Sequence, residues 1–312
     1  MNAILFPGQG SQVVGMGLEF YNNFEIVKNI FKEADEKLSF KLSKMILEGP
    51  EDELKLTQNT QPAILTVSYA IFSVLKKEFN FDFKNSKFFA GHSLGEYSAL
   101  VCSESLSFND ALFLLFERGK SMQEAVPVGK GSMIAVLGSK LDEVKIFLDK
   151  IKQKGVCEIA NDNADGQIII SGDTESIRLI QNILKDNKKK FIPLNVSAPF
   201  HCSMMKPAAD KMKDKINSIN FQKPIFDIVC NVTSQPENNP ENIKKLLVDQ
   251  IFSTVRWRES IINMYNQKVN NFIEIGPGKV LSGMVKRTVK NINSFSINSI
   301  NDMKKTVNES KK

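Results

Sequence analysis

The stretch "KFFAGHSLGEYSAL", residues 87–100, decides the fold, because it joins an apolar strand to a helix through a turn that reads G-x-S-x-G. A strand that leads directly into a helix is typical of α/β proteins with a mainly parallel sheet. The turn places Ser93 between Gly91 and Gly95, so its hydroxyl can stand exposed at the edge of the sheet. A five-residue match can arise by chance, and a helix-capping serine is the other interpretation. The flanking strand and helix favour a nucleophile.

The same alternation of strands and helices continues on both sides of this stretch. Helices are expected at residues 60–77 and from Ser107 onward, where the serine can cap the helix. Strand-like runs are expected at residues 3–6, 226–234 and 269–279. The polar tail after Asn301 is expected to fray.

The middle of the chain has a different rhythm. From about residue 130 to residue 197 the pattern is strand, helix, strand, strand, helix, strand, which is the order of a ferredoxin-like unit. We therefore predict an α/β core built from residues 1–128 and 198–312, with a ferredoxin-like (βαββαβ) subdomain inserted at residues 129–197.

The composition excludes several classes of protein. Of 312 residues, 42% are hydrophobic and 24% are charged, as in soluble globular proteins, and no apolar run is long enough to cross a bilayer. The start "MNAILFPGQG" lacks the features of a secretory signal, and the four cysteines are scattered, so we expect a cytoplasmic protein with reduced thiols. The net charge of +6 fits either an acidic partner or a merely lysine-rich surface. No aromatic residues alternate with the basic ones, so nucleic-acid binding is not expected.

The chain has only two histidines, His92 and His201. A His-rich metal site is therefore impossible, no Cys/His cluster has zinc spacing, and we expect no metal. Any imidazole base for Ser93 must be one of these two residues. Side chains of neighbouring residues on a tight turn tend to diverge, which argues against His92. His201, in "NVSAPFHCSMM", follows the inserted unit where the chain returns to the core, and its position favours it as the base.

Arg118 falls on the apolar face of its predicted helix, in line with Ala111, Leu115 and Met122. A guanidinium among apolar side chains is costly unless it is paired, since arginine keeps its charge inside proteins. Either a carboxylate of this protein pairs with Arg118, or the side chain binds an anionic ligand.

Two glycine-rich loops follow predicted strands. "FPGQGSQ" lacks the third glycine of a dinucleotide fingerprint, because Val13 stands at that position. "EIGPGKVLSG" is too short for a phosphate loop and has no Ser or Thr after its Gly-Lys pair. Both are interpreted as tight loops at strand ends, where α/β proteins build their sites, and no cofactor is expected.

Five segments in order, between about residues 4 and 287, resemble the malonyl-CoA:acyl carrier protein transacylase family. They are "FPGQGSQ", "GHSLGEYSAL", "RGKSMQEAVP", "NVSAPFH" and "EIGPGKVLSGMVKR". The resemblance implies an α/β-hydrolase-like core with a ferredoxin-like insertion. It also implies transfer of malonyl from malonyl-CoA to acyl carrier protein for fatty acid biosynthesis, and we expect a monomer.

The resemblance also implies roles for single residues. Ser93 would be the acylated nucleophile, His201 its base, and Gln250 the residue whose carbonyl orients the histidine. Arg118 would clamp the malonyl carboxylate. This chain departs from the family near Gln250, since Thr254 stands where the family usually has proline.

The remaining implied roles concern the acyl oxygen. The backbone N–H groups of Gln9 and Leu94 would form the oxyanion hole, and Gln9 would also contact the substrate.

Two other functions use the same residues. A serine thioesterase or esterase would share Ser93 and His201 but admit water as the second nucleophile; a triad acid would favour it, and Arg118 argues against it. A catalytically inert interaction module is the third hypothesis, and the intact set of Ser93, His201 and Arg118 argues against it.

Overall fold

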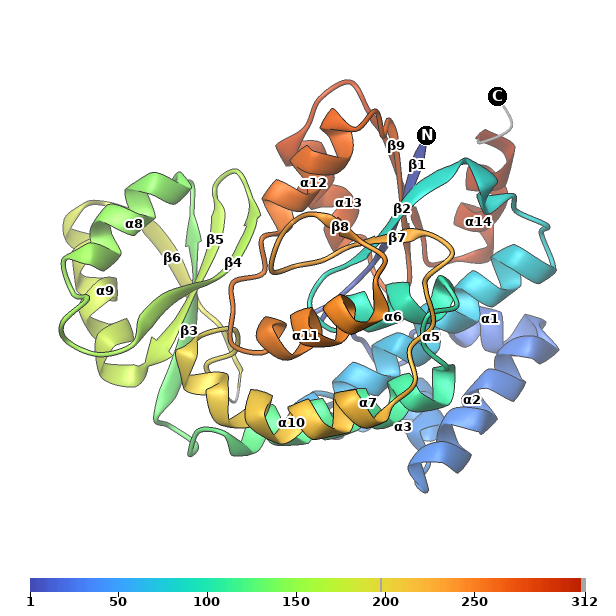
Figure 1. The fold of residues 1–312 in the computed structure, drawn as a ribbon, viewed down its shortest axis with the longest axis horizontal. Coiled ribbons are helices and arrows are strands. Elements are labelled where there is room, and N and C mark those ends of the chain that lie inside the picture. The colour runs from blue at the N-terminus through green and yellow to red at the C-terminus, as the bar shows by residue number, and fades with distance from the viewer. Residues whose placement is uncertain (197, 310–312) are drawn as a thin grey trace.

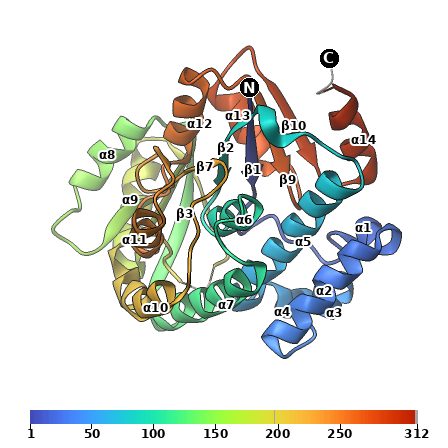
Figure 2. The ribbon, with the colours of Figure 1, turned by 45° about the vertical axis from the view of Figure 1, so that its right-hand side comes forward.

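The computed structural model describes residues 1–196 and 198–309, and in this part of the chain the strands form two separate sheets (Figures 1 and 2). The larger sheet has the order β10-β9-β1-β2-β7-β8. Its strands are β1 (Asn2–Phe6), β2 (Ser86–Gly91), β7 (Asp227–Val229), β8 (Pro236–Glu237), β9 (Asn271–Ile275) and β10 (Asn293–Ile297). All neighbours pair in parallel except β7 and β8, which are antiparallel. The predicted α/β class with a mainly parallel sheet is confirmed.

The central strand β1 is buried on both faces, because its side chains alternate between two layers of helices. Ile4 and Phe6 belong to the hydrophobic cluster formed with α5 (Thr57–Lys77) and α7 (Phe108–Glu124). Ala3 and Leu5 belong to the cluster formed with α12 (Trp257–Asn266) and α13 (Val280–Thr288). Parallel pairing places Phe6 opposite Gly91, so β1 and β2 end together at one edge of the sheet. The loops after these two strands are therefore neighbours.

All helices outside the segment that forms the smaller sheet, which we call the larger part of the protein, surround the larger sheet. They are α1 (Leu18–Asn23), α2 (Glu25–Leu38), α3 (Leu42–Glu48), α4 (Glu51–Leu54), α5 (Thr57–Lys77), η1 (Phe83–Asn85), α6 (Gly95–Cys102), α7 (Phe108–Glu124), η2 (Ser203–Met205), α10 (Lys206–Ser218), α11 (Pro240–Gln250), α12 (Trp257–Asn266), α13 (Val280–Thr288) and α14 (Ile300–Glu309). The predicted cap of α7 is confirmed, since Ser107 Oγ accepts a hydrogen bond from the N–H of Asp110 at 3.0 Å. None of the helices in the described ranges is long and apolar enough to cross a membrane.

The smaller sheet is antiparallel and has the order β4-β5-β3-β6. Its elements are β3 (Gly131–Leu137), α8 (Leu141–Asp149), β4 (Cys157–Ala164), β5 (Gln167–Asp173), α9 (Thr174–Asp186) and β6 (Lys190–Pro193). Both helices lie on the same face of the sheet, at the left of Figure 1, where they close a separate hydrophobic cluster. The predicted order of strands and helices is confirmed.

Some predictions at the ends of elements and at the C-terminus are wrong. The last strand of the smaller sheet stops at Pro193, and Ser197, which was expected to close that strand and the inserted unit, lies outside the described residues. The chain after Asn301 was expected to fray, but it is helical up to Glu309. It forms most of α14, whose buried residues Met303 and Val307 are one helical turn apart and pack toward β10. Residues 310–312 are outside the described part.

Candidate active site

Ser93 lies on a sharp turn between β2 and α6 and has a positive φ of 53°. Both glycines of the motif are required by close backbone contacts. A Cβ added to Gly91 would lie 1.8 Å from the carbonyl carbon of Gly95, and one added to Gly95 would lie 2.3 Å from the carbonyl oxygen of Phe6. The turn is thus pressed against the end of β1, and it holds the serine at the start of α6, as a nucleophile elbow does.

His201 contacts the Ser93 hydroxyl: Ser93 Oγ lies 2.8 Å from His201 Nε2. The other ring nitrogen, Nδ1, lies 2.8 Å from the main-chain oxygen of Gln250, the last residue of α11. A carbonyl oxygen only accepts hydrogen bonds, so Nδ1 carries the proton and Nε2 is left as an acceptor for the serine O–H. The ring is therefore in the tautomer that a general base needs.

Burial and, to a smaller extent, the positive charge of Arg118 lower the pKa of His201 to about 3, and the hydrogen bond to the Gln250 carbonyl opposes them. His201 is thus neutral at pH 7 in the unliganded protein.

The other histidine has different partners. His92 Nε2 lies 2.8 Å from Asn163 Oδ1 in β4, and the ring meets Trp257 edge-on with the centroids 5.6 Å apart. Burial lowers the pKa of His92, and the hydrogen bond with Asn163 opposes this shift. The two neighbouring side chains of the turn diverge, as expected from the sequence, and His201 alone of the two histidines bonds to the Ser93 hydroxyl.

Arg118 lies beside the same hydroxyl and is only 1% exposed. Its Nη2 donates to Ser93 Oγ at 3.2 Å and to Gln250 Oε1 at 2.9 Å, and its Nη1 donates to Gln61 Oε1 at 2.7 Å. Within residues 1–196 and 198–309 these hydrogen-bond acceptors are all uncharged, and Nε has no partner. Burial lowers the pKa of Arg118, and nearby Tyr97 and Glu96 oppose this. The sequence left two alternatives for Arg118, and the first of them, a carboxylate of this protein bound directly to the guanidinium, is not found in the described part of the chain.

Gln9 and Leu94 lie on the two loops that meet at the edge of the sheet. A Cβ added to Gly8 would lie 2.5 Å from the carbonyl oxygen of His92, so the loop after β1 rests on the serine turn. Gln9 is partly buried in the wall of the cavity, and its Nε2 donates weakly to Thr57 Oγ1 at 3.4 Å. Leu94 is buried and is the residue before α6.

Three polar residues of the site were not predicted from the sequence. Asn231 accepts the N–H of Ser93 at 2.7 Å through Oδ1 and donates through Nδ2 to the Gly91 oxygen at 2.7 Å. Gln61 holds Arg118, and Glu96 is buried beneath the serine turn with 1% exposure. Only Asn231 carried a signal, because it directly follows the strand-like run "DIVC"; Gln61 is one of five consecutive polar residues, "TQNTQ", and does not stand out.

A cavity of about 610 Å³ lies between the two sheets. Ser93, His201 and Arg118 line it from the larger part, and Met133 and Ile169 line it from the smaller sheet. No group of three or more His, Cys, Asp or Glu side chains in the described residues is arranged to hold a metal ion.

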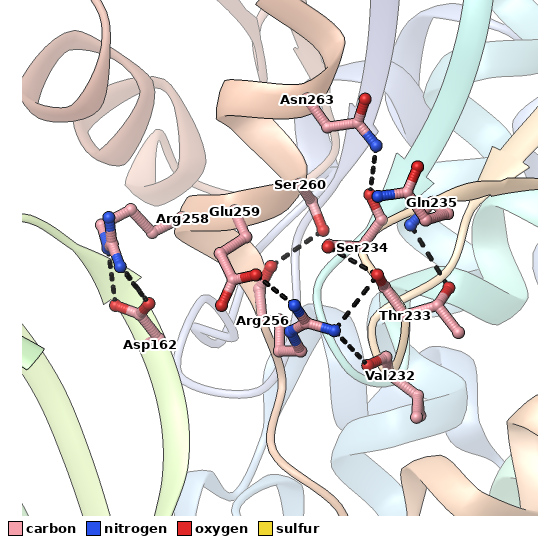
Figure 3. A network of polar contacts seen from close by, with 10 residues as sticks. All are labelled: Asp162, Val232, Thr233, Ser234, Gln235, Arg256, Arg258, Glu259, Ser260 and Asn263. Atoms are coloured by element: carbon pink, nitrogen blue, oxygen red, sulfur yellow. Dashed lines mark hydrogen bonds and ion pairs between the residues drawn. The ribbon is translucent and has the colours of Figure 1, made fainter. Parts of the chain in front are cut away.

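The segment after α11 ties the two walls of this cavity together. Thr254 Oγ1 donates to the Ile159 oxygen in β4 at 2.5 Å, and the N–H of Asp162 donates to the Val255 oxygen at 3.0 Å. Arg258 contacts both carboxylate oxygens of Asp162 (Figure 3). Thr254, where the sequence departs from the family pattern, thus links the loop after Gln250 to the smaller sheet.

Comparison with known proteins gives a consistent result. Residues 4–311 match the acyl transferase domain family. The malonyl CoA-acyl carrier protein transacylase of Bacillus subtilis is 44% identical over 95% of this chain and 92% of its own length. The acyl-carrier-protein-S-malonyltransferase structure from Bartonella henselae is 41% identical with a TM-score of 0.96, covering 99% of this chain and 98% of that one. A malonyl-transacylase solved in complex with a type II PKS acyl-carrier protein is 38% identical with a TM-score of 0.95 over 99% of both chains. This chain therefore belongs to the malonyl-CoA:acyl carrier protein transacylase family.

Proposed function

We propose that this protein transfers the malonyl group from malonyl-CoA to the phosphopantetheine thiol of acyl carrier protein and so supplies fatty acid biosynthesis. One observation carries the choice of acyl group. The buried Arg118 guanidinium lies 3.2 Å from Ser93 Oγ, and its hydrogen-bond acceptors in the described residues are neutral. A planar guanidinium beside the nucleophile suits an acyl chain that ends in a carboxylate.

In the first half-reaction, Ser93 Oγ attacks the thioester carbonyl carbon of malonyl-CoA, and His201 Nε2 takes the hydroxyl proton. The N–H groups of Gln9 and Leu94 donate to the negatively charged oxygen that develops, aided by the N-terminus of α6. The C–S bond then breaks, and His201 returns the proton to the departing coenzyme A thiolate. The product is a malonyl ester of Ser93.

The second half-reaction reverses these steps with a new thiol. The pantetheine thiol of the carrier protein gives its proton to His201 and attacks the malonyl ester, and Ser93 recovers its proton as the ester bond breaks. A serine, an imidazole and a guanidinium supply the nucleophile, the base and the anion contact. We therefore propose that the reaction needs no cofactor or metal, with malonyl-CoA as a substrate.

We further infer that residues 1–128 and 198–312 form an α/β-hydrolase-like catalytic domain and residues 129–197 a ferredoxin-like subdomain. The second assignment is supported by the β-α-β-β-α-β order and by two helices on one face of a sheet ordered β4-β5-β3-β6. Because one chain supplies Ser93, His201 and Arg118, the site does not require a second subunit, and we propose a monomer. A coenzyme A substrate and four unpaired cysteines fit the cytoplasm.

The decisive experiment is an intact mass spectrum after brief incubation with malonyl-CoA. We expect a stable gain of one malonyl group, which disappears when carrier protein with its pantetheine arm is added and reappears on that protein. Steady release of free malonate without carrier protein would instead identify a thioesterase. Neither adduct nor turnover would identify an inert module.

The low pKa of His201 predicts an unusual pH profile for acylation. A general base with an ordinary histidine pKa of about 6.5 would lose most of its activity between pH 7.5 and 5.5, because it would become protonated. His201, with its pKa lowered to about 3, stays neutral over this range, so kcat/KM for malonyl-CoA should not fall through protonation of the base. Stopped-flow acylation from pH 5.5 to 8 measures this. A tenfold decline of kcat/KM toward low pH, centred near pH 6.5, would contradict a lowered pKa for the general base.

A further inference from the structure

Glu96 is a buried acid that the reaction steps above do not use. It lies in the first turn of α6 and is 1% exposed. Its Oε2 accepts the N–H of Asn231 at 2.9 Å and the Nε2 of Gln250 at 2.9 Å. Its Oε1 has no hydrogen-bond partner among the residues that the structure describes. A buried carboxyl with one fully used oxygen and one unused oxygen calls for an explanation.

This carboxyl is the nearest of the acceptors that set the direction of the Gln250 side-chain amide. The two ends of a primary amide have nearly the same shape but opposite hydrogen-bonding roles. The Nε2 end faces acceptors: Glu96 Oε2, the Ser93 oxygen at 3.1 Å and Asn231 Oδ1 at 3.3 Å. The Oε1 end faces Arg118 Nη2 at 2.9 Å. In the flipped state the amide nitrogen would oppose the guanidinium, so two donors would meet, and the three acceptors would face an oxygen and lose their hydrogen bond from Gln250.

We propose that Glu96 is a positioning residue for acyl selectivity, which fixes the direction of the Gln250 amide and thereby holds Arg118 where it meets the acyl carboxylate. This inference rests on the proposed function. The connection runs from Glu96 Oε2 to Gln250 Nε2, and from Gln250 Oε1 to the guanidinium. The main-chain oxygen of Gln250 holds His201 separately, so the side chain of Gln250 serves Arg118 and its backbone serves the base.

The protonation state of Glu96 does not alter this geometry. Burial raises the pKa of Glu96 to about 7, against the hydrogen bonds from Asn231 and Gln250 and the charge of Arg118. A proton taken up by Glu96 goes to the unpartnered Oε1, and Oε2 remains an acceptor in both states. Glu96→Gln reproduces the neutral state, with its carbonyl in place of Oε2. Glu96→Leu has a similar volume but offers no acceptor.

The test compares Glu96→Leu with Glu96→Gln in the transfer assay, using malonyl-CoA and acetyl-CoA with the same carrier protein. We expect Glu96→Leu to raise KM for malonyl-CoA by roughly tenfold to a hundredfold, the size of a lost hydrogen bond to a charged group. Its acetyl transfer should stay within about threefold of the wild type, since acetyl makes no contact with Arg118. Glu96→Gln should behave as the wild type with both substrates.

Three results would overturn the inference. They are an unchanged malonyl KM in Glu96→Leu, an equal loss of malonyl and acetyl transfer in that variant, and lost malonyl preference in a folded Glu96→Gln protein. The third result can be measured even if Glu96→Leu does not fold, because Glu96→Gln exchanges only one oxygen for an NH2 group and is expected to fold. Wild-type protein in the same assay separates this inference from the proposed function: absent malonyl transfer there refutes the function itself.

Discussion

Replacing Ser93 with alanine is expected to abolish the malonyl adduct and to lower transfer to the carrier protein by about a millionfold, the size of effect seen when a serine nucleophile is removed. The reason is that Ser93 Oγ is the only protein atom that forms a bond to the acyl carbon in the proposed reaction. His201 Nε2, 2.8 Å away, loses the proton it would take and has nothing to activate but water. The measurement is the intact mass after malonyl-CoA, together with the rate of carrier-protein acylation.

The matched control is Ser98→Ala, on the same helix α6. Ser98 is fully buried, and its hydroxyl has no hydrogen-bond partner in the described residues. This variant should label with malonyl as the wild type does. The Ser93→Ala protein should keep a near-normal melting curve, because the lost hydroxyl faces the cavity rather than the core. Persistent labelling of Ser93→Ala would show that another group carries the acyl chain.

The parts of the site that were predictable from the sequence rest on scarce residue types. Only two histidines were candidates for a base, and a cationic residue on an apolar helix face stands out against its neighbours. The strand β1 was predictable because a short apolar run that ends in a Pro/Gly loop is typical of a buried strand. Such features are local, and they do not depend on knowing which distant segment lies nearby.

The contacts that Asn231, Gln61 and Glu96 make around the serine were not predictable, because they join distant parts of the chain. Asn231 reaches the N–H of Ser93 across 138 positions, and Gln250 reaches Glu96 across 154. Asparagine and glutamine are common on surfaces, so their type alone carries little information. The tail was mistaken for a similar reason: Met303 and Val307 are two apolar residues in a polar segment, and only packing toward β10 shows that they stabilise a helix.

Replacing Arg118 with alanine is expected to lower malonyl transfer by about 30-fold to several thousand-fold, which corresponds to about 2–5 kcal/mol for truncating one partner of a buried charged contact. Acetyl transfer should be kept or raised, since acetyl has no carboxylate and the pocket no longer holds a cation. Arg118→Lys keeps the charge but loses the planar fork, so its malonyl rate should fall between those of the wild type and Arg118→Ala.

The opposite interpretation of Arg118, a structural cation, makes a different prediction. Had the guanidinium neutralised a buried carboxylate directly, its removal would leave that charge unpaired, at a cost of about 3–5 kcal/mol in the free energy of unfolding. Instead its hydrogen-bond acceptors include the amide oxygens of Gln61 and Gln250, and Gln61 lines the cavity, where water can replace the lost donor. We therefore expect a small change in the melting temperature of Arg118→Ala and a large fall in its ratio of malonyl to acetyl transfer. An unchanged ratio together with a strongly lowered melting temperature would mean that Arg118 stabilises the fold and does not select the acyl group.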